Sequence, residues 1–243
     1  KVFSLNGIDV STPIPRLTYQ ESISRFGTDR PDTRFGLELT DVTECFAETP
    51  FQVFLEMIRE GACIKGIRVP GRADYSRKQL DDLREWVRRL NEKAGLSWLK
   101  RTPEGLKSSL PKLVPNQELE AVAEAAQIKE GDLFLMAAGA GTLVHPLLAQ
   151  LRTHVAKQEQ LIPEGIYNFV WVYDFPLLQW DEQEKRYFAC HHPFTSPRDE
   201  DIELLESDPA RVRSKAYDIV LNGTELGGGS IRIHQQSLQE RIL

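Results

Sequence analysis

One dipeptide fixes how two strands of this chain pair, and it constrains the fold more than any other feature. Asn222-Gly223 separates two strand-like segments, 216–221 and 225–233. Asn-Gly between alternating apolar residues is the strongest short-range signal for a two-residue β-hairpin turn. Because side chains on a strand alternate between faces, this turn predicts that Asp218 and Glu225 share one face as a diagonal cross-strand pair.

Two carboxylates on one sheet face suit Mg²⁺, a hard cation that takes one or two protein carboxylates together with phosphate oxygens. In the simple register of the hairpin, Asp218 faces Gly227. The sequence therefore predicts a Mg²⁺ site at Asp218 and Glu225. The alternative is a solvent-exposed polar face, which antiparallel sheets commonly carry.

Three consecutive glycines follow in the second strand. A run such as Gly227-Gly228-Gly229 weakens a strand unless a ligand or another backbone comes close, and it can hold a β-bulge. Arg232 lies seven residues after Glu225, an odd spacing that puts it on the opposite face of a regular strand. One bulge at the glycines would bring Arg232 beside the carboxylates, where its guanidinium can clamp a carboxylate ligand with two hydrogen bonds. An arginine on the outer face of an edge strand is the alternative.

Two adjacent histidines, His191 and His192, precede a proline-bounded turn. They suit an anion or an amino-acid substrate, although histidine pairs are more often structural. The neighbouring Cys190 does not indicate zinc, since consecutive strand residues point to opposite faces and no second ligand pair has the required spacing. Gly139-Ala140-Gly141 lacks the rest of a phosphate-binding motif, so it predicts only a tight strand-to-helix turn.

Apolar periodicity divides the chain into three segments and predicts an α+β fold. Residues 1–35 hold a short strand or coil and a helix, residues 36–160 alternate strands and helices, and residues 161–243 contain mainly antiparallel strands. The predicted strands are 35–42, 62–69, 96–99, 132–138, 168–174, 186–189, 216–221 and 225–233. Three predicted helices are marked by their start, at the capping boxes Thr18–Glu21 and Ser76–Gln79 and at an N-cap at Asn116. Four more are predicted at 51–58, 142–158, 199–206 and 209–214.

Charge and composition limit the classes of protein. The formal net charge is −6, from 30 Lys and Arg against 36 Asp and Glu, so a chain that acts mainly as a nucleic-acid clamp is not expected. No apolar run approaches the roughly 18–20 residues of a membrane span, and the cysteines form no Cys-x-x-Cys pair, which fits a reducing compartment. We expect a soluble, cytoplasmic protein. Because neither Lys1 nor Leu243 lies in linker-like sequence, we also expect it to be part of a longer one.

Four motifs, in this order along the chain, resemble bacterial-type aspartyl-tRNA synthetase. They are FGLELTD (35–41), WVYDFP (171–176), HHPFTSP (191–197) and YDIVLNGTELGGGSIRIH (217–234). Residues 27–32, GTDRPD, match the segment that precedes the insertion domain of that family. Residues 36–160 resemble this insertion, the GAD domain, which is also similar to a module of the B subunit of tRNA-dependent amidotransferase.

The resemblance implies a GAD-type α/β insertion domain, between catalytic-domain segments at 1–35 and 161–243 that form an incomplete class II antiparallel sheet. It implies a cytoplasmic homodimer that activates L-aspartate with ATP and Mg²⁺ and transfers it to tRNA.

By position, Asp218 and Glu225 resemble the Mg²⁺-binding carboxylates, and Glu225 also faces ATP. Arg232 resembles the clamp for the aspartate side chain. His191 and His192 fall where the family has a substrate-contacting histidine, and the match favours His191. It assigns no catalytic residue.

The chain also departs from the family. Its sequence has no anticodon-reading β-barrel, no dimer-interface motif, no arginine motif for the α-phosphate and no C-terminal Gly-Leu-Asp-Arg motif. We therefore expect the chain to be inactive by itself. A freestanding GAD-like module that binds tRNA or protein is the main alternative, and a regulatory paralogue with an aspartate-binding sheet is another. Residues 217–234 discriminate between a synthetase and such a module, because a non-catalytic module has no need of the carboxylates, three glycines and arginine in this segment.

Overall fold

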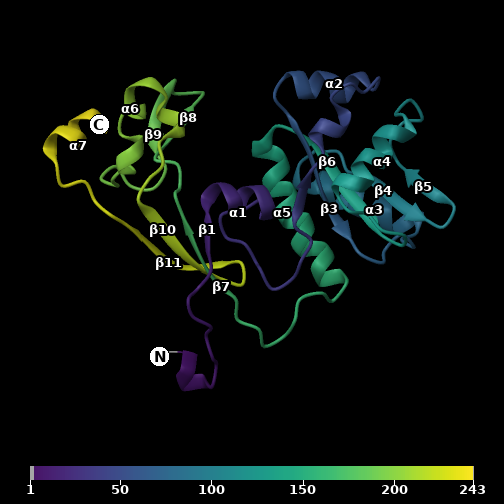
Figure 1. Ribbon diagram of the computed structural model, residues 1–243, viewed down its shortest axis with the longest axis horizontal. Helices are drawn as coiled ribbons and strands as arrows, with labels where there is room; N and C mark the ends of the chain where they lie inside the picture. The colour runs from purple at the N-terminus through teal and green to yellow at the C-terminus, as the bar shows by residue number, and fades with distance from the viewer. Residues whose placement is uncertain (1–2, 243) are drawn as a thin grey trace. The chain divides into compact units, whose positions relative to one another are not determined.

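The computed structural model describes residues 3–242, so the predictions about Lys1 and Leu243 lie outside the described residues. The chain forms two compact units, which Figure 1 draws with their helices and strands labelled. The first unit contains the residues up to 23, residues 29–34 and the residues from 164 onward. The second unit contains residues 24–28 and 35–163.

The first unit is built on a four-stranded sheet in the order β1-β7-β10-β11. β1 runs parallel to β7, and the other two pairings are antiparallel. The elements of this unit are η1 (Phe3–Asn6), β1 (Arg16–Thr18), the start of α1 (Tyr19–Phe26), β7 (Phe169–Tyr173), β8 (Leu178–Asp181), β9 (Arg186–Ala189), η3 (Asp199–Asp201), α6 (Leu204–Ser207), η4 (Pro209–Arg211), β10 (Ala216–Leu221), β11 (Thr224–Ser230) and α7 (Gln236–Ile242).

One face of this sheet is packed. Alternate residues of β7 and β10 point into a small apolar core, which consists of Val170, Val172, Phe175, Ala216 and Val220 with Leu17 and Tyr19 against it. The predicted capping box at the start of α1 is confirmed, because the Thr18 hydroxyl accepts from the Glu21 N–H while the Glu21 carboxylate accepts from the Thr18 N–H. Gly27, at φ 74°, ends the helix.

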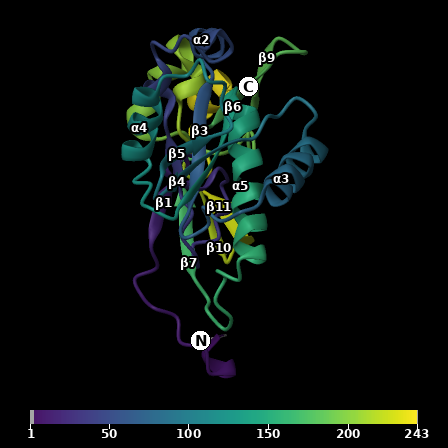
Figure 2. The ribbon, with the colours of Figure 1, turned by 90° about the vertical axis from the view of Figure 1, so that its right-hand side faces the viewer.

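The second unit consists of a five-stranded antiparallel sheet, in the order β2-β3-β6-β4-β5, with helices on both faces. Its elements are β2 (Leu39–Asp41), η2 (Thr43–Phe46), α2 (Gln52–Arg59), β3 (Cys63–Val69), α3 (Arg77–Leu90), β4 (Ser97–Thr102), β5 (Gly105–Ser108), α4 (Asn116–Ala125), β6 (Leu133–Gly139) and α5 (Gly141–Gln158). Figure 2 shows α4 on one side of β3 and β6, and α3 and α5 on the other. Apolar residues of the sheet accordingly divide between two cores, one against α3 and α5 and one against α2, η2 and α4.

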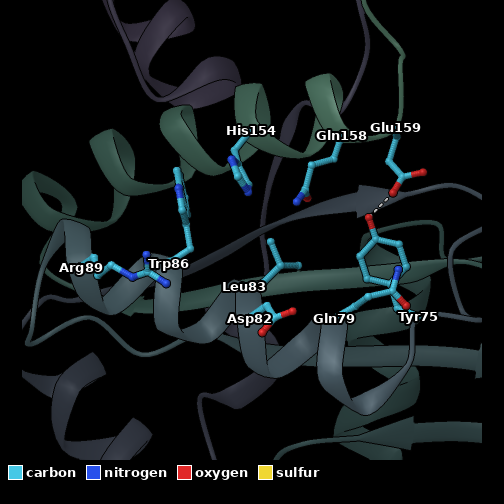
Figure 3. A pocket seen from close by; sticks show the side chains of 9 residues that line it. All are labelled: Tyr75, Gln79, Asp82, Leu83, Trp86, Arg89, His154, Gln158 and Glu159. Atoms are coloured by element: carbon cyan, nitrogen blue, oxygen red, sulfur yellow. Dashed lines mark hydrogen bonds between the residues drawn. The ribbon is translucent and has the colours of Figure 1, made fainter.

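A polar groove of about 470 Å³ lies between α3 and α5 (Figure 3). The ring of Trp86 stacks on that of His154 at 4.2 Å between centroids. Further along, the Tyr75 hydroxyl donates to Glu159. The lining mixes acids, bases and amides, and none of the predicted site residues belongs to it.

Several local predictions for this unit are confirmed. Ser76 and Gln79 form the predicted reciprocal capping box at the start of α3. Gly139 and Gly141 form the predicted tight turn between β6 and α5, with Ala140 as the N-cap. Asn116 is not an N-cap, however, because Pro115 takes that position and its carbonyl accepts from the Glu118 N–H.

The strand predicted at 35–42 is too long, since β2 covers only Leu39–Asp41. The carbonyls of Phe35 and Gly36 accept hydrogen bonds from the Arg152 guanidinium instead of from a neighbouring strand, and Leu37 has a positive φ of 60°. A buried side chain thus overrides the alternating pattern.

Four more elements differ from the sequence prediction. The helix predicted at 199–206 is divided into η3 and α6, and the one predicted at 209–214 is only the short 3-10 helix η4. β5 and β8 do not appear in the sequence prediction, because both are short edge strands without a buried residue. None of the helices in residues 3–242 is long and apolar enough to span a membrane.

Candidate functional site

The β10–β11 hairpin carries the two predicted carboxylates, Asp218 and Glu225, and its turn has the predicted form. Leu221 pairs with Thr224 across the two-residue loop. Asn222 and Gly223 both have positive φ, 52° and 84°, as a type I′ turn requires. The Asn222 carboxamide fastens the turn by accepting from the Asn168 N–H at 2.9 Å.

A β-bulge interrupts the hairpin between Glu225 and Gly227. Glu225 pairs with Val220, but the next paired residue on β11 is Gly227, opposite Ile219. Leu226 is therefore the extra residue, and the bulge lies one position before the three glycines. The predicted pairing of Asp218 with Gly227 is wrong for this reason.

Beyond the bulge, Asp218 pairs with Gly228 and Ala216 with Ser230. Facing residues of antiparallel strands share a face, so the even-numbered residues 228 and 230 lie on the face of Asp218. The same face also carries Glu225, opposite Val220. Because Leu226 is an extra residue, the odd separation of seven positions between Glu225 and Arg232 no longer puts them on opposite faces of the strand.

Asp218 is a buried carboxylate, 7% exposed. Its side chain makes no hydrogen bond or ion pair within residues 3–242. Burial raises its pKa, the negative charge of Glu225 raises it further, and His191 opposes the rise. Burying an unpaired charge is costly, so this carboxylate favours a cation or a proton as its partner.

The donor set fits Mg²⁺. Asp218 and the exposed Glu225 supply hard oxygen ligands from one face, and Mg²⁺ typically combines one or two carboxylates with water and phosphate oxygens. The described residues contain no group of three or more His, Cys, Asp or Glu side chains arranged to hold a metal ion.

The two histidines differ in their surroundings. The ring of His191 packs edge-on against Phe175, with centroids 4.7 Å apart, and its charge acts on Asp218. His192 instead accepts a hydrogen bond at Nδ1 from the Phe194 N–H at 3.1 Å. His191 is therefore the histidine that acts electrostatically on Asp218, while the His192 ring is held within its own turn.

Arg232 follows β11 and is exposed. Its Nη1 donates to the hydroxyl of Thr195 at 3.3 Å. Within residues 3–242 no carboxylate lies in ion-pair distance of its guanidinium, so most of its donors stay available to a ligand.

A loop far from the hairpin in sequence also reaches the site. Asp29 and Arg30 act electrostatically on Asp218 in opposite directions, Asp29 raising its pKa and Arg30 lowering it. The loop touches the hairpin turn, since a β-carbon on Gly223 would lie 3.3 Å from Cβ of Asp32. The sequence predicts no role for Asp29 and Arg30, although GTDRPD (27–32) resembles a motif of the family.

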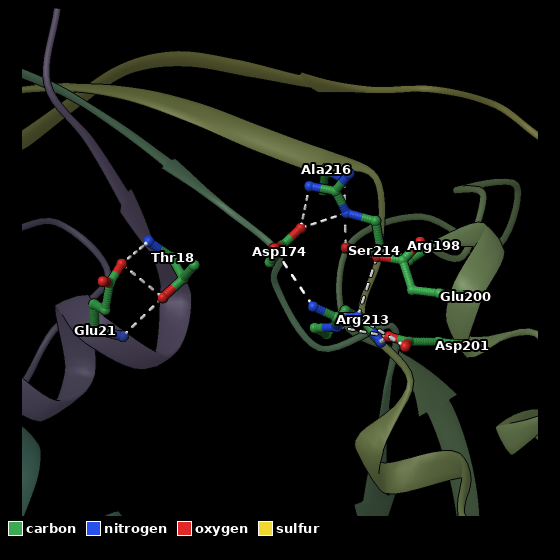
Figure 4. Close-up of polar contacts among 9 residues, drawn as sticks. All are labelled: Thr18, Glu21, Asp174, Arg198, Glu200, Asp201, Arg213, Ser214 and Ala216. Carbon is green, nitrogen blue, oxygen red and sulfur yellow. Dashed lines mark hydrogen bonds and ion pairs between the residues drawn. The ribbon is translucent and has the colours of Figure 1, made fainter.

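An ion-pair network supports the segment between the histidines and β10 (Figure 4). Arg213 donates to both oxygens of Asp201, at 2.7 and 2.9 Å, and Arg198 pairs with Asp174 at the end of β7. Hydrogen bonding from Arg213 lowers the pKa of the Asp201 carboxyl. The network joins three separate stretches of chain, at Asp174, at 198–201 and at Arg213.

The opposite face of the sheet holds a second cavity, of about 580 Å³. Aromatic and basic side chains line it, with Tyr217 next to Asp218 in β10 but pointing the other way. They include Arg16, Trp171, Tyr173, Arg198, Lys215 and Tyr217. The predicted site residues are not among them.

Comparison with known proteins gives one consistent result. Residues 1–243 match the family described as tRNA synthetases class II (D, K and N). The chain is 51% identical to the aspartate–tRNA(Asp/Asn) ligase of Caldanaerobacter subterraneus subsp. tengcongensis over 97% of its own length and 40% of that protein. It is 49% identical to the ligase of the same name from Geotalea uraniireducens, over 96% of this chain and 39% of that protein.

A third relative has a narrower name. The chain is 46% identical to the aspartate–tRNA ligase of Clostridium acetobutylicum, over 100% of this chain and 41% of that protein. The chain thus spans about 40% of the length of the relatives that it matches. The family match covers both units and confirms the resemblance found in the motifs: the chain belongs to the class II tRNA synthetases of the D, K and N type.

Proposed function

We propose that the chain is part of an aspartate–tRNA ligase that activates L-aspartate with ATP and Mg²⁺ and transfers it to tRNA(Asp). One observation carries the proposal: the bulge at Leu226 puts Asp218, Glu225 and Ser230 on one face of the β10–β11 hairpin, and the hydroxyl of Thr195 lies near that of Ser230 and accepts from Arg232. The names of the similar proteins support the same activity.

Aspartate would bind through its side-chain carboxylate to Arg232. A guanidinium offers parallel N–H donors that match a carboxylate, and Arg232 has no competing acid among the described residues. His191, near Asp218 and against Phe175, would contact the substrate from the adjacent loop. His192 is the second candidate for that contact.

Asp218 and Glu225 would hold Mg²⁺, and Glu225 would also face ATP. Bound Mg²⁺ supplies neutralisation of phosphate charge. The contribution of the chain is positional, because the hairpin keeps the two carboxylates on one face, and the buried Asp218 carboxylate has no hydrogen-bonding or ion-pair partner among residues 3–242. Ion binding would offset the desolvation of Asp218.

We assign residues 36–160 to a GAD insertion domain, with 1–35 and 161–243 as segments of the catalytic domain. Support comes from the separate sheet and two cores of the second unit. The complete protein would act as a cytoplasmic homodimer. A freestanding GAD-like module is less well supported, since the family match includes residues 217–234.

Pyrophosphate exchange tests the proposal. The complete enzyme should exchange labelled pyrophosphate into ATP when L-aspartate and Mg²⁺ are present, and not with L-asparagine in its place. The 243-residue chain by itself should show no exchange, because its sequence lacks the α-phosphate arginine motif and the Gly-Leu-Asp-Arg motif, and adenylation needs phosphate charge to be neutralised in place. Exchange by the complete enzyme that does not depend on aspartate would contradict the proposed activity. Exchange by this chain alone would contradict its proposed inactivity.

A further inference from the structure

Arg232 is exposed, but the group that holds it is not. Thr195 is 2% exposed, and its Oγ1 accepts from Arg232 Nη1 at 3.3 Å. The same hydroxyl lies 3.2 Å from Oγ of Ser230. A buried threonine therefore links the arginine to the strand that precedes it.

The backbone fixes this hydroxyl in place. Ser196 N–H donates to the carbonyl of Ile231 at 2.8 Å, and Ile233 N–H donates to that of Phe194 at 2.9 Å. Thr195 and Arg232 are thus facing residues of a short antiparallel bridge. Facing residues share a face, which explains why the hydroxyl meets the guanidinium.

The direction of the hydrogen bond between Arg232 and Thr195 follows from the groups, while either hydroxyl can donate in the one between Thr195 and Ser230. A guanidinium only donates, so Thr195 Oγ1 is the acceptor from Arg232. Its own proton is then free to be donated to Ser230 Oγ, at 3.2 Å. In this arrangement Arg232 uses one N–H inside the protein and keeps the others for a ligand.

We propose that Thr195 is a positioning residue for the aspartate clamp: its hydroxyl, oriented by Ser230, holds the Arg232 guanidinium in the plane in which it receives the substrate carboxylate. The inference rests on the proposed function for the role of Arg232. A bidentate pair needs both N–H groups aligned with both oxygens, and an exposed arginine is otherwise free to sample several rotamers. Fixing it beforehand lowers the entropy cost of binding.

The test uses the complete enzyme and four variants: Thr195→Val, Thr195→Ser, Arg232→Ala and the double variant Thr195→Val/Arg232→Ala. Valine keeps the shape of threonine but cannot accept a hydrogen bond. Thr195→Val should raise KM for aspartate about tenfold, in line with the loss of one hydrogen bond to a charged group, and leave KM for ATP within about twofold. Thr195→Ser should stay within about twofold of wild type for both substrates.

The double variant separates positioning from general structure. If Thr195 acts through Arg232, Thr195→Val should change kcat/KM for aspartate less than about twofold once Arg232 is alanine. Thr224→Val, the same change at an exposed threonine of β11, is the matched control and should leave KM for aspartate unchanged.

Three results would overturn the inference: an unchanged aspartate KM in Thr195→Val, no rescue by serine, or the same loss in both Arg232 backgrounds. If Thr195→Val does not fold, as judged by thermal unfolding, Ser230→Ala replaces it. That variant should raise KM for aspartate about two- to fivefold through the weaker orientation of the hydroxyl, and no rise would count against the inference. Failure of the proposed function is seen separately, as a wild-type enzyme without aspartate-dependent exchange.

Discussion

The carboxylate of Asp218 lies directly over Gly228 on the neighbouring strand. A β-carbon at position 228 would overlap Oδ1 of Asp218 and lie 3.0 Å from the backbone oxygen of Tyr217. Gly229 is restricted from the other side, since a β-carbon there would lie 2.8 Å from the Tyr217 hydroxyl. Two of the three glycines thus make room for the side chains of β10.

Gly228→Ala should displace the Asp218 carboxylate. We expect a loss of about 1–3 kcal/mol in the free energy of unfolding of the chain, typical of overpacking, and at least a tenfold rise in the Mg²⁺-ATP KM of the complete enzyme. Gly227→Ala is the matched control, because nothing lies within 4 Å of a β-carbon at that position. Urea unfolding and steady-state kinetics measure both effects, and equal behaviour of the two variants would contradict the account.

Asp218→Asn should make the chain more stable at neutral pH. Burial raises the pKa of Asp218 in the folded chain above its value of 3.8 in the unfolded chain, so the folded state is favoured below the unfolded pKa, and stability is lost as pH rises through the folded pKa. The Asp218→Asn variant does not lose this stability, because its side chain does not ionise. The stability difference between variant and wild type, measured by urea unfolding, should shrink as pH falls from neutral toward 4; a variant less stable at neutral pH would contradict the assignment.

Asp201→Asn should have the opposite pH signature. Arg213 lowers the pKa of Asp201, so the stabilisation is present above the unfolded pKa and is lost as pH falls through the folded pKa, below about 4. We expect the variant to lose about 1–3 kcal/mol at neutral pH and little in acid. Asp199→Asn is the control, since Asp199 pairs with Lys215 but is 79% exposed, and it should lose less than about 1 kcal/mol.

The contacts of Arg152 predict which truncated segment of the second unit is most stable. It is 2% exposed, donates to the carbonyls of Phe35 and Gly36, and lies over the rings of Phe26 and Phe35, at 4.9 and 4.1 Å from their centroids. Segment 24–163 should therefore unfold cooperatively in urea and be at least about 2 kcal/mol more stable than segment 36–160, which leaves a buried charge with fewer partners. Segment 36–163 controls for the C-terminal trimming and should resemble 36–160; equal stability of all three would contradict the argument.

Local features of the fold could be predicted from the sequence, and long-range ones could not. The capping boxes at Thr18 and Ser76 and the Asn222-Gly223 turn involve residues within three positions of each other, so a short stretch of sequence determines them. The strand predicted at 35–42 is too long, because the carbonyls of Phe35 and Gly36 bind Arg152. That residue lies 117 and 116 positions away from them along the chain. No periodicity in a segment reports a hydrogen bond to a distant side chain.

The candidate site shows the same division. The spacing of Asp218, Glu225 and Arg232 indicated that a bulge would bring them to one face, because all three lie within 15 residues of one another. The bulge lies at Leu226 rather than at the glycines, and the spacing of these residues alone does not distinguish the two positions. The approach of Asp29 and Arg30 to Asp218 crosses almost the whole chain, and only the resemblance of their motif to a family gave any signal for them.

The central claim is that Arg232 clamps the aspartate side chain while Asp218 and Glu225 face Mg²⁺-ATP. In the complete enzyme, Arg232→Lys should lower kcat/KM for aspartate nearly as much as Arg232→Ala does, since lysine cannot form two parallel hydrogen bonds. Glu225→Gln should weaken Mg²⁺-ATP use and leave aspartate binding largely intact. Arg211→Ala, at an arginine that is 75% exposed, is the control for loss of a surface charge.

Steady-state kinetics of Arg232→Ala against each substrate is the most direct test. We expect kcat/KM for aspartate to fall about 30- to 1,000-fold, which corresponds to roughly 2–4 kcal/mol for a lost charge-assisted contact. KM for ATP should change less than about threefold. A variant whose kcat and KM for aspartate stay within about threefold of wild type, a loss of less than about 1 kcal/mol, would contradict the assignment of Arg232 and of the bulge that brings it to the site.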